Sequence, residues 1–126
     1  MQNILLVFLG GGLGSLARYG ISQLFITQWA SKYSATVATL SANVLASFIL
    51  AVVWISIDLG KLPQNLKFLV LIGFCGGFST FSTFSFETFQ LLRQGFFGVA
   101  ALNVLLSVAI CLLAIYVVFK YEVHPG

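Results

Sequence analysis

Four long apolar stretches divide this chain, and they restrict its fold more than any other feature of the sequence. They run over residues 4–26, 35–57, 66–92 and 96–121, and charged or turn-forming residues separate them. Because a helix that spans a bilayer needs about 20 predominantly apolar residues, each stretch is long enough for one crossing. The alternation that is typical of a membrane barrel is missing. The sequence therefore predicts an all-α integral membrane protein with a single four-helix transmembrane domain over residues 1–126.

Charged residues are scarce, at 7% of the chain, while hydrophobic residues make up 60%. A soluble domain carries roughly 25% charged residues because it has a large surface to cover. This composition excludes an ordinary cytoplasmic enzyme, and we expect no enzymatic activity. The net charge is +3, but the six basic residues are scattered singly between Arg18 and Lys120. Since they form no basic patch, we expect no nucleic-acid partner. The expected surroundings are the lipid bilayer.

The basic residues divide evenly between the two sides of the membrane. Three lie on one side and three lie on the other or lean toward it: Lys61, Lys67 and Lys120 against Arg18, Lys32 and Arg93. Since cytoplasmic loops normally carry an excess of Lys and Arg, this tie indicates insertion in both orientations. Four helices also leave little interior for a substrate path. We therefore expect an antiparallel, dual-topology homodimer whose two-fold axis lies in the membrane plane.

The third stretch has a polar midpoint near Ser79. Two glycines, Gly76 and Gly77, are followed by five hydroxyl residues within seven positions. Such a segment is a poor helix core, because Gly costs about 1 kcal/mol relative to Ala and Ser and Thr compete for backbone hydrogen bonds. We expect the helix to break near residues 76–80. In lipid a break is tolerated only where protein or a water-filled cavity covers it, so it predicts a buried ion or substrate site. The alternative is a Gly-x-x-x-Gly packing face made by Gly73 and Gly77.

The side chains after the expected break suit a small anion. Phe81 and Phe84 lie one helical turn apart with hydroxyl groups around them. Aromatic rings have positive edges, and the N-terminus of the second half-helix is positive as well. Together they hold an anion without any fixed cationic charge. The carbonyls freed near Gly76 and Ser79 have the opposite polarity and suit a small cation.

Three further polar residues lie inside apolar stretches. Asn43 is in mid-span, where an amide is costly unless it is paired, so it is a candidate functional residue. Arg18 either extends its side chain to the headgroups or attracts anions in a vestibule. Glu87 lies eight residues beyond Ser79, about 12 Å along a helix. It is either an interfacial carboxylate or a gating or proton-carrying one.

Four motifs, in order along the chain, resemble those of one family. They are GGLGSLARY at residues 11–19, TLSAN at 39–43, GFCGGFSTFSTFSFET at 73–88 and NVLLS at 103–107. The third closely resembles the signature of the Fluc fluoride channels, also called the CrcB-like family, and the resemblance covers nearly the whole chain. It implies a dual-topology homodimer with two antiparallel pores in the bacterial plasma (inner) membrane. Such a channel exports cytoplasmic fluoride passively and gives fluoride resistance.

The resemblance also assigns roles to individual residues. The implied pore residues are the two phenylalanines, an asparagine, and hydroxyl and amide groups: Phe81, Phe84, Asn43, Thr80, Ser82, Thr83, Asn103 and Ser107. The backbone carbonyls of Gly76 and Ser79 match those that hold a structural sodium ion at the dimer centre. Arg18 and Glu87 match vestibule residues. Many relatives have Tyr at the position of Asn103, where this chain departs from the pattern.

Two other functions compete with a fluoride channel. A proton-coupled small multidrug exporter also has four helices and inserts in both orientations, but it needs a membrane-embedded acid. The first stretch contains no acidic residue, and Glu87 in the third is off-centre. In a non-transporting membrane subunit, the polar midplane serves only to hold helices together. A fluoride pore needs neutral donors that replace the water around the ion without trapping it behind a full positive charge. Hydroxyls, amides and ring edges meet that need.

Overall fold

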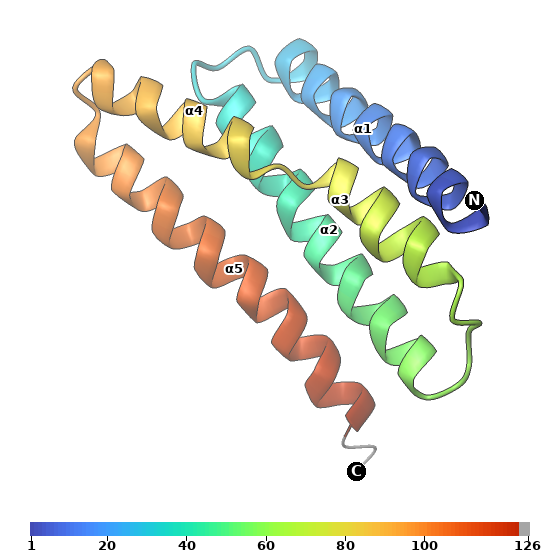
Figure 1. Ribbon diagram of the computed structural model, residues 1–126. Coiled ribbons are helices and arrows are strands. Elements are labelled where there is room, and N and C mark those ends of the chain that lie inside the picture. The colour runs from blue at the N-terminus through green and yellow to red at the C-terminus, as the bar shows by residue number, and fades with distance from the viewer. Residues whose placement is uncertain (124–126) are drawn as a thin grey trace.

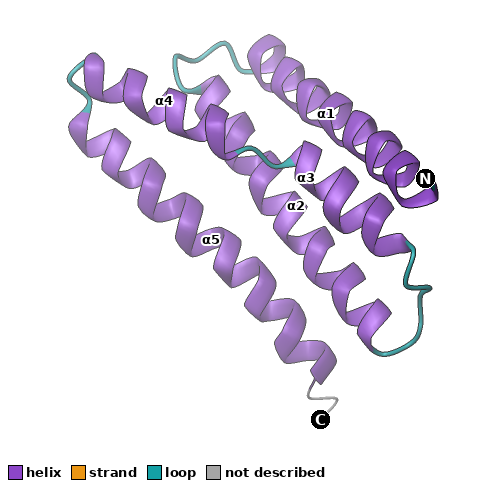
Figure 2. Ribbon diagram, in the orientation of Figure 1, coloured by secondary structure: helices purple, strands orange, loops and turns teal. Residues whose placement is uncertain are grey.

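The computed structural model describes residues 1–123, so residues 124–126 of the expected domain lie outside the described part. All regular structure in the described part is helical (Figures 1 and 2). The elements are α1 (Gln2–Gln28), α2 (Ser34–Asp58), η1 (Lys67–Phe74), α3 (Cys75–Phe78), α4 (Phe81–Arg93) and α5 (Phe97–Val123).

Four helical segments are long and apolar enough to cross a membrane. They are α1, α2, the combined segment Lys67–Arg93, and α5. Each begins and ends within two residues of the apolar stretch that predicts it. The chain is therefore a multi-pass integral membrane protein. Both termini of the described chain and the α2–η1 turn lie toward one end of the bundle, and the other two turns lie at the opposite end (Figure 1).

Glycines bring α1 into backbone contact with η1 and α3. A Cβ added to Gly14 would meet the carbonyl of Phe74, and one added to Gly77 would meet the carbonyl of Gly11. Gly73 is equally close, since its added Cβ would lie 2.9 Å from the Cα of Gly10. Small residues are what allow membrane helices to approach this closely. The packing interpretation of Gly73 and Gly77 is confirmed for this contact.

The first part of the third span is a π-helix, η1, which the sequence does not predict. The amide of Cys75 at its end donates to the carbonyl of Val70, five residues back. π-helices usually occur as single turns inside α-helices, whereas η1 has eight residues. It is the element against which α1 packs most extensively. Apolar periodicity does not distinguish the two helix types here.

Two extended residues separate α3 from α4. Ser79 has φ −81° and ψ 156°, and Thr80 has φ −153° and ψ 118°. Gly76 and Gly77 themselves are helical, so only the last two residues of the expected segment leave the helix. The Ser79 amide still donates to the carbonyl of Cys75 at 2.9 Å. The Thr80 amide has no helical acceptor and must find another within the protein.

The helix α2 occupies the centre of the bundle. On one side Ala42 and Ala46 pack against Phe78 of α3, and on another Ala51 and Ile55 pack against α5. Beyond the two extended residues, α4 leaves α1 and approaches α5 (Figure 1). Within the described residues, α5 contacts only α2 and α4. A cavity lies beside α2 at the level of Ser79 and Thr80.

Candidate functional site

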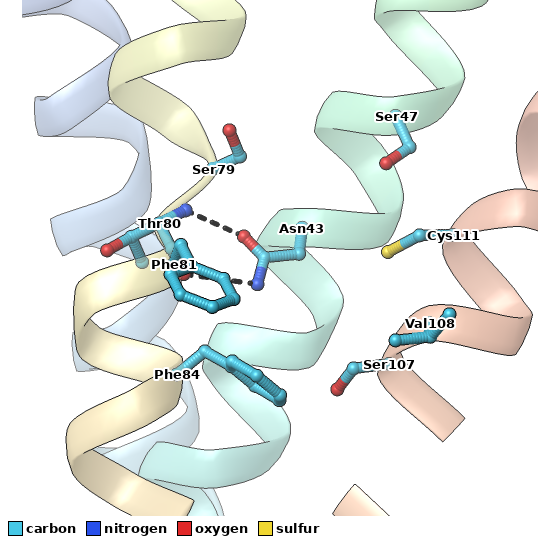
Figure 3. Close-up of a pocket in the computed structure, with 9 residues that line it drawn as sticks. All are labelled: Asn43, Ser47, Ser79, Thr80, Phe81, Phe84, Ser107, Val108 and Cys111. Carbon is cyan, nitrogen blue, oxygen red and sulfur yellow. Dashed lines mark hydrogen bonds between the residues drawn. The ribbon is translucent and has the colours of Figure 1, made fainter. Parts of the chain in front are cut away.

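A cavity of about 300 Å³ lies where α2, α4, α5 and the two extended residues meet (Figure 3). Its lining residues are Asn43, Ser47, Ser79, Thr80, Phe81, Phe84, Ser107, Val108 and Cys111. None of these nine side chains carries a formal charge at neutral pH. The wall is mostly apolar with a few polar groups, which is the usual character of a small-ligand site.

Asn43 satisfies the backbone where the helix is interrupted. Its Oδ1 accepts a 2.8 Å hydrogen bond from the Thr80 amide, and its Nδ2 donates to the Thr80 carbonyl at 3.4 Å (Figure 3). Because an amide N–H can only donate, Oδ1 must be the atom that faces it. The orientation of the Asn43 amide is thereby fixed. Nδ2 has two hydrogens, so one N–H is available to a ligand in the cavity.

Thr80 also caps α4 at the cavity. Its Oγ1 accepts a hydrogen bond from the Thr83 amide at 3.2 Å and donates to Thr83 Oγ1 at 3.1 Å. Thr is a preferred N-cap residue for this reason. The positive end of the α4 dipole therefore lies at the cavity wall and favours negative charge there.

Phe81 and Phe84 stand next to each other on the cavity wall (Figure 3). Their ring centroids are 5.8 Å apart and the ring planes are tilted by 41°. Phe81 is 79% exposed in the single chain. A ring this exposed at the midpoint of a span is covered either by lipid or by another protein surface.

The α5 side of the cavity is polar at one point, Ser107. Its Oγ lies 3.5 Å from Oδ1 of Asn103, and Nδ2 of Asn103 donates to Thr88 Oγ1 of α4 at 3.0 Å. Asn103 is 7% exposed and does not line the cavity. It lies behind Ser107 and links α5 to α4.

A second polar cavity of about 270 Å³ lies between α1, α2 and α4. Its lining residues are Ser15, Arg18, Tyr19, Ser22, Ala38, Thr39, Thr83 and Glu87. Arg18 Nε donates to the carbonyl of Gly77 at 3.1 Å, and Thr39 Oγ1 donates to Glu87 Oε1 at 2.8 Å. The other carboxylate oxygen of Glu87 is buried without a partner in residues 1–123. Arg18 and Glu87 share this cavity but form no ion pair within the described residues.

Comparison with known proteins identifies the family. The profile of the family described as "CrcB-like protein, Camphor Resistance (CrcB)" matches residues 5–119. The chain belongs to the CrcB-like family. It is 46% identical over 114 residues to a protein of Coxiella burnetii (strain CbuK_Q154), covering 88% of this chain and 90% of the relative. It is 41% identical over 116 residues to one of Shewanella frigidimarina (strain NCIMB 400), covering 92% of each. Both relatives are named "Fluoride-specific ion channel FluC". The name describes a channel, and the chain accordingly belongs to a family of transporters and not of enzymes.

The structure distributes the predicted pore residues of this CrcB-like protein over several places. Five of them line the first cavity together: Asn43, Thr80, Phe81, Phe84 and Ser107. Thr83 lines the second cavity, and Ser82 is exposed and lines neither of the two cavities. Asn103 is behind the wall, as described above. The two predicted vestibule residues, Arg18 and Glu87, meet in the second cavity. Their functional roles stay predictions.

Ser47, Val108 and Cys111 line the first cavity and were not predicted as pore residues. A signal was available for two of them. Ser47 lies four residues after Asn43, and Cys111 lies four residues after Ser107, so each shares a helix face with a predicted residue. The thiol of Cys111 is a weak hydrogen-bonding group, so its place in the wall does not make it a ligand.

The carbonyls of Gly76 and Ser79 are released from the helical hydrogen-bond pattern. The amide four residues after Gly76 belongs to Thr80, which donates to Asn43 instead. The amide four residues after Ser79 belongs to Thr83, which donates to the Thr80 side chain. Open space surrounds Gly76 on its Cβ side. Among the described residues no cluster of His, Cys, Asp and Glu could hold a metal ion.

Proposed function

We propose that this CrcB-like protein is a fluoride channel that lets cytoplasmic fluoride leave the cell passively. The names of relatives at 41% and 46% identity support the choice of ion. The observation that carries the proposal is the fixed amide of Asn43, whose Oδ1 is held by the Thr80 amide at 2.8 Å. This contact leaves an N–H donor for an anion in a cavity without charged side chains.

The chemistry of the cavity suits fluoride in particular. The ion is small and strongly hydrated, so a pore must replace its water with hydrogen-bond donors and must also release it. The Asn43 amide, the capped N-terminus of α4 and the ring edges of Phe81 and Phe84 supply partial positive charge. The proposed pore is lined by these groups together with Thr80 and Ser107. The other predicted pore residues, Ser82, Thr83 and Asn103, lie outside this cavity.

Membrane potential supplies the driving force. An inside-negative potential contributes about 2.3 kcal/mol per charge per 100 mV and moves an anion outward. Export then needs neither a nucleotide nor a coupled ion. We place the protein in the bacterial inner membrane, where such a potential exists, and we expect it to give fluoride resistance.

The proposed assembly is an antiparallel homodimer with two pores. Two features of the single chain support it. Phe81 is 79% exposed although it belongs to the cavity wall. Gly76 has open space on its Cβ side, which allows a second backbone to approach. An inverted second copy would cover the same features on both chains, as a self-complementary interface does.

A structural sodium ion at the centre of this dimer is part of the proposal. The free carbonyls of Gly76 and Ser79 fit it, since sodium takes uncharged oxygen ligands. One chain offers two such carbonyls, and a second copy related by the two-fold axis would supply the same two. The ion would hold the interrupted spans of the two chains together. Arg18 and Glu87 are the proposed vestibule residues, on the side of α4 away from the pore cavity.

The competing function, a proton-coupled multidrug exporter, depends on Glu87. This carboxylate is inside the third span and has one buried oxygen without a partner in the described residues. It lines the second cavity and not the one that contains Asn43 and the two phenylalanines. The two functions predict different responses to a pH gradient across the membrane. Fluoride efflux through a channel is insensitive to an imposed pH gradient at constant potential, whereas an exporter moves an organic cation only with such a gradient.

The test is fluoride efflux from liposomes that contain the purified protein, followed with a fluoride electrode and with chloride as the control ion. We expect rapid fluoride efflux and no chloride efflux. Phe84→Ile should reduce fluoride efflux at least tenfold, because it removes a ring from the cavity wall. Phe89→Ile is the matched control, since Phe89 is an exposed residue of the same helix and lines neither cavity. Equal efflux through both variants would contradict the pore assignment, and no fluoride efflux by the wild type would contradict the function.

A further inference from the structure

Three hydrogen bonds connect the cavity wall on α5 to the backbone of α4. Ser107 Oγ donates to Asn103 Oδ1 at 3.5 Å, and Asn103 Nδ2 donates to Thr88 Oγ1 at 3.0 Å. Thr88 Oγ1 in turn donates to the carbonyl of Phe84 at 2.8 Å. Only Ser107 and Phe84 line the cavity. Thr88 and Asn103 lie between the helices, outside the proposed pore.

The single hydroxyl hydrogen of Thr88 fixes the direction of all three bonds. Because that hydrogen is donated to the Phe84 carbonyl, Thr88 Oγ1 can act only as an acceptor toward Asn103. The atom of Asn103 that faces Thr88 must therefore be Nδ2, which turns Oδ1 toward Ser107. Ser107 then donates its own hydrogen to Oδ1. The Ser107 hydrogen is therefore directed at Asn103, which does not line the cavity.

This arrangement determines what Ser107 offers to an ion. With its hydrogen directed at Asn103, the hydroxyl presents lone pairs to the cavity, and lone pairs repel an anion. The bond to Asn103 is long, at 3.5 Å, compared with about 2.7 to 2.8 Å for a typical hydroxyl bond. An anion that reaches the cavity competes for the same hydrogen. The Ser107 hydrogen is therefore bound only weakly to Asn103, and an anion in the cavity can displace this bond. A donor of this kind suits a pore that must release each ion.

We infer that Thr88 is a positioning residue of the pore: through Asn103 it directs the Ser107 hydroxyl away from the cavity and so weakens the hold of the α5 wall on fluoride. The inference rests on the proposed function. Thr88 touches no ion and acts only through two other side chains. Removing its hydroxyl releases the Asn103 amide, which can then turn its Nδ2 to Ser107 and let Ser107 donate into the cavity.

The experiment compares Thr88→Val with the wild type in the liposome assay over a range of fluoride concentrations. We expect the half-saturating fluoride concentration to fall at least threefold and the maximal rate to fall as well, because a tighter site releases the ion more slowly. Thr88→Ser keeps the hydroxyl and should behave as the wild type. Asn103→Leu removes the acceptor of Ser107 by another route and should shift the half-saturating concentration in the same direction, which covers the case in which Thr88→Val does not fold.

Two controls separate positioning from a general structural effect. In a Ser107→Ala background, Thr88→Val should have no further effect on the half-saturating concentration. Thr27→Val also removes a hydroxyl that donates to a carbonyl four residues back, at 2.8 Å to Gln23, but at an exposed site outside both cavities. It should leave efflux unchanged. A Thr88→Val protein with wild-type saturation, or with the same shift in the Ser107→Ala background, would overturn this inference alone. A wild type that releases no fluoride would overturn the proposed function.

Discussion

At the scale of single residues, Asn43 has two tasks that a substitution can separate. Its Oδ1 completes the backbone at Thr80, and its Nδ2 leaves a donor for the cavity. Asn43→Asp keeps an acceptor for Thr80 and nearly the same size, but it replaces the donor with a negative charge. A hydrogen bond to a charged group is worth about 1.5 to 3 kcal/mol, and about 1.4 kcal/mol corresponds to a factor of ten.

We therefore expect Asn43→Asp to reduce fluoride efflux at least tenfold while the protein still folds. Asn65→Asp makes the same chemical change in the exposed turn between α2 and η1 and should leave efflux unchanged. The measurement is fluoride efflux from liposomes that contain each variant at the same protein density. If Asn43→Asp and Asn65→Asp conduct equally well, Asn43 is not a donor to the permeating ion.

The sequence identifies residues of the site better than it identifies their partners. The cost of an unpaired amide in a span singles out Asn43, but its partner is the Thr80 amide, which is available only because Thr80 leaves the helix. For Asn103 the sequence predicts the helix face but not the contact with another helix. Its spacing from Ser107 correctly places both on one face of α5, yet the approach of Thr88 from α4 makes Asn103 a link between helices. Contacts between elements determine which group each site residue binds, and spacing within one helix does not reveal those contacts.

At the scale of elements, glycines set the distance between α1 and the first half of the third span. A Cβ at Gly14 would meet the backbone carbonyl of Phe74, and backbone cannot move aside as a side chain can. Gly12, two residues earlier on the same helix, has open space on its Cβ side. Overpacking of this kind costs about 1 to 3 kcal/mol, whereas Ala in place of an exposed helical Gly gains up to about 1 kcal/mol.

Gly14→Ala should therefore lower the free energy of unfolding by about 1 to 3 kcal/mol, and Gly12→Ala should leave it equal or slightly higher. Thermal unfolding of the two variants in the same detergent, followed by circular dichroism, measures the difference. Equal stability of Gly14→Ala and the wild type would mean that α1 does not lie this close to η1 and α3 in the membrane.

The elements also differ in how well the sequence predicts them. Span limits follow from apolar length, because lipid requires about 20 apolar residues per crossing, and those limits agree with the structure. The two extended residues lie inside the glycine and hydroxyl segment that disfavours a helix, although Gly76, Gly77 and the later hydroxyl residues of that segment are helical. The π-helix η1 has no counterpart in the sequence pattern. It packs against α1, which is a long-range contact that local propensity does not encode.

At the scale of the whole molecule, the structure changes the count of charges that orient the protein. Arg18 donates to the Gly77 carbonyl inside the bundle, so it does not belong to a membrane face. The remaining basic side chains are three on the face of the α2–η1 turn and two on the other: Lys61, Lys67 and Lys120 against Lys32 and Arg93. A difference of one leaves orientation weakly determined. Both orientations are what an antiparallel dimer needs.

Lysines added to one face should remove this near balance of positive charge between the two faces. Gln64→Lys with Asn65→Lys adds two charges to the α2–η1 turn, and Gln28→Lys with Gln94→Lys adds two to the opposite face; all four side chains are exposed. Since cytoplasmic loops retain Lys and Arg, each pair should commit the protein to one orientation, and the two pairs to opposite ones. Protease access to a tag at the C-terminus, measured from each side of the membrane, reports the orientation directly.

If each working pore needs two inverted copies, either pair alone should lose most of the wild-type fluoride efflux per molecule, because chains inserted in one orientation find no inverted partner. Coexpression of the two pairs should restore efflux, because oppositely inserted chains then meet in one membrane. Gln64→Lys with Gln94→Lys is the matched control: it adds the same two charges, one to each face, and should keep wild-type efflux. Full efflux from a variant inserted in a single orientation would rule out the antiparallel dimer and leave a channel built from one chain or from parallel copies.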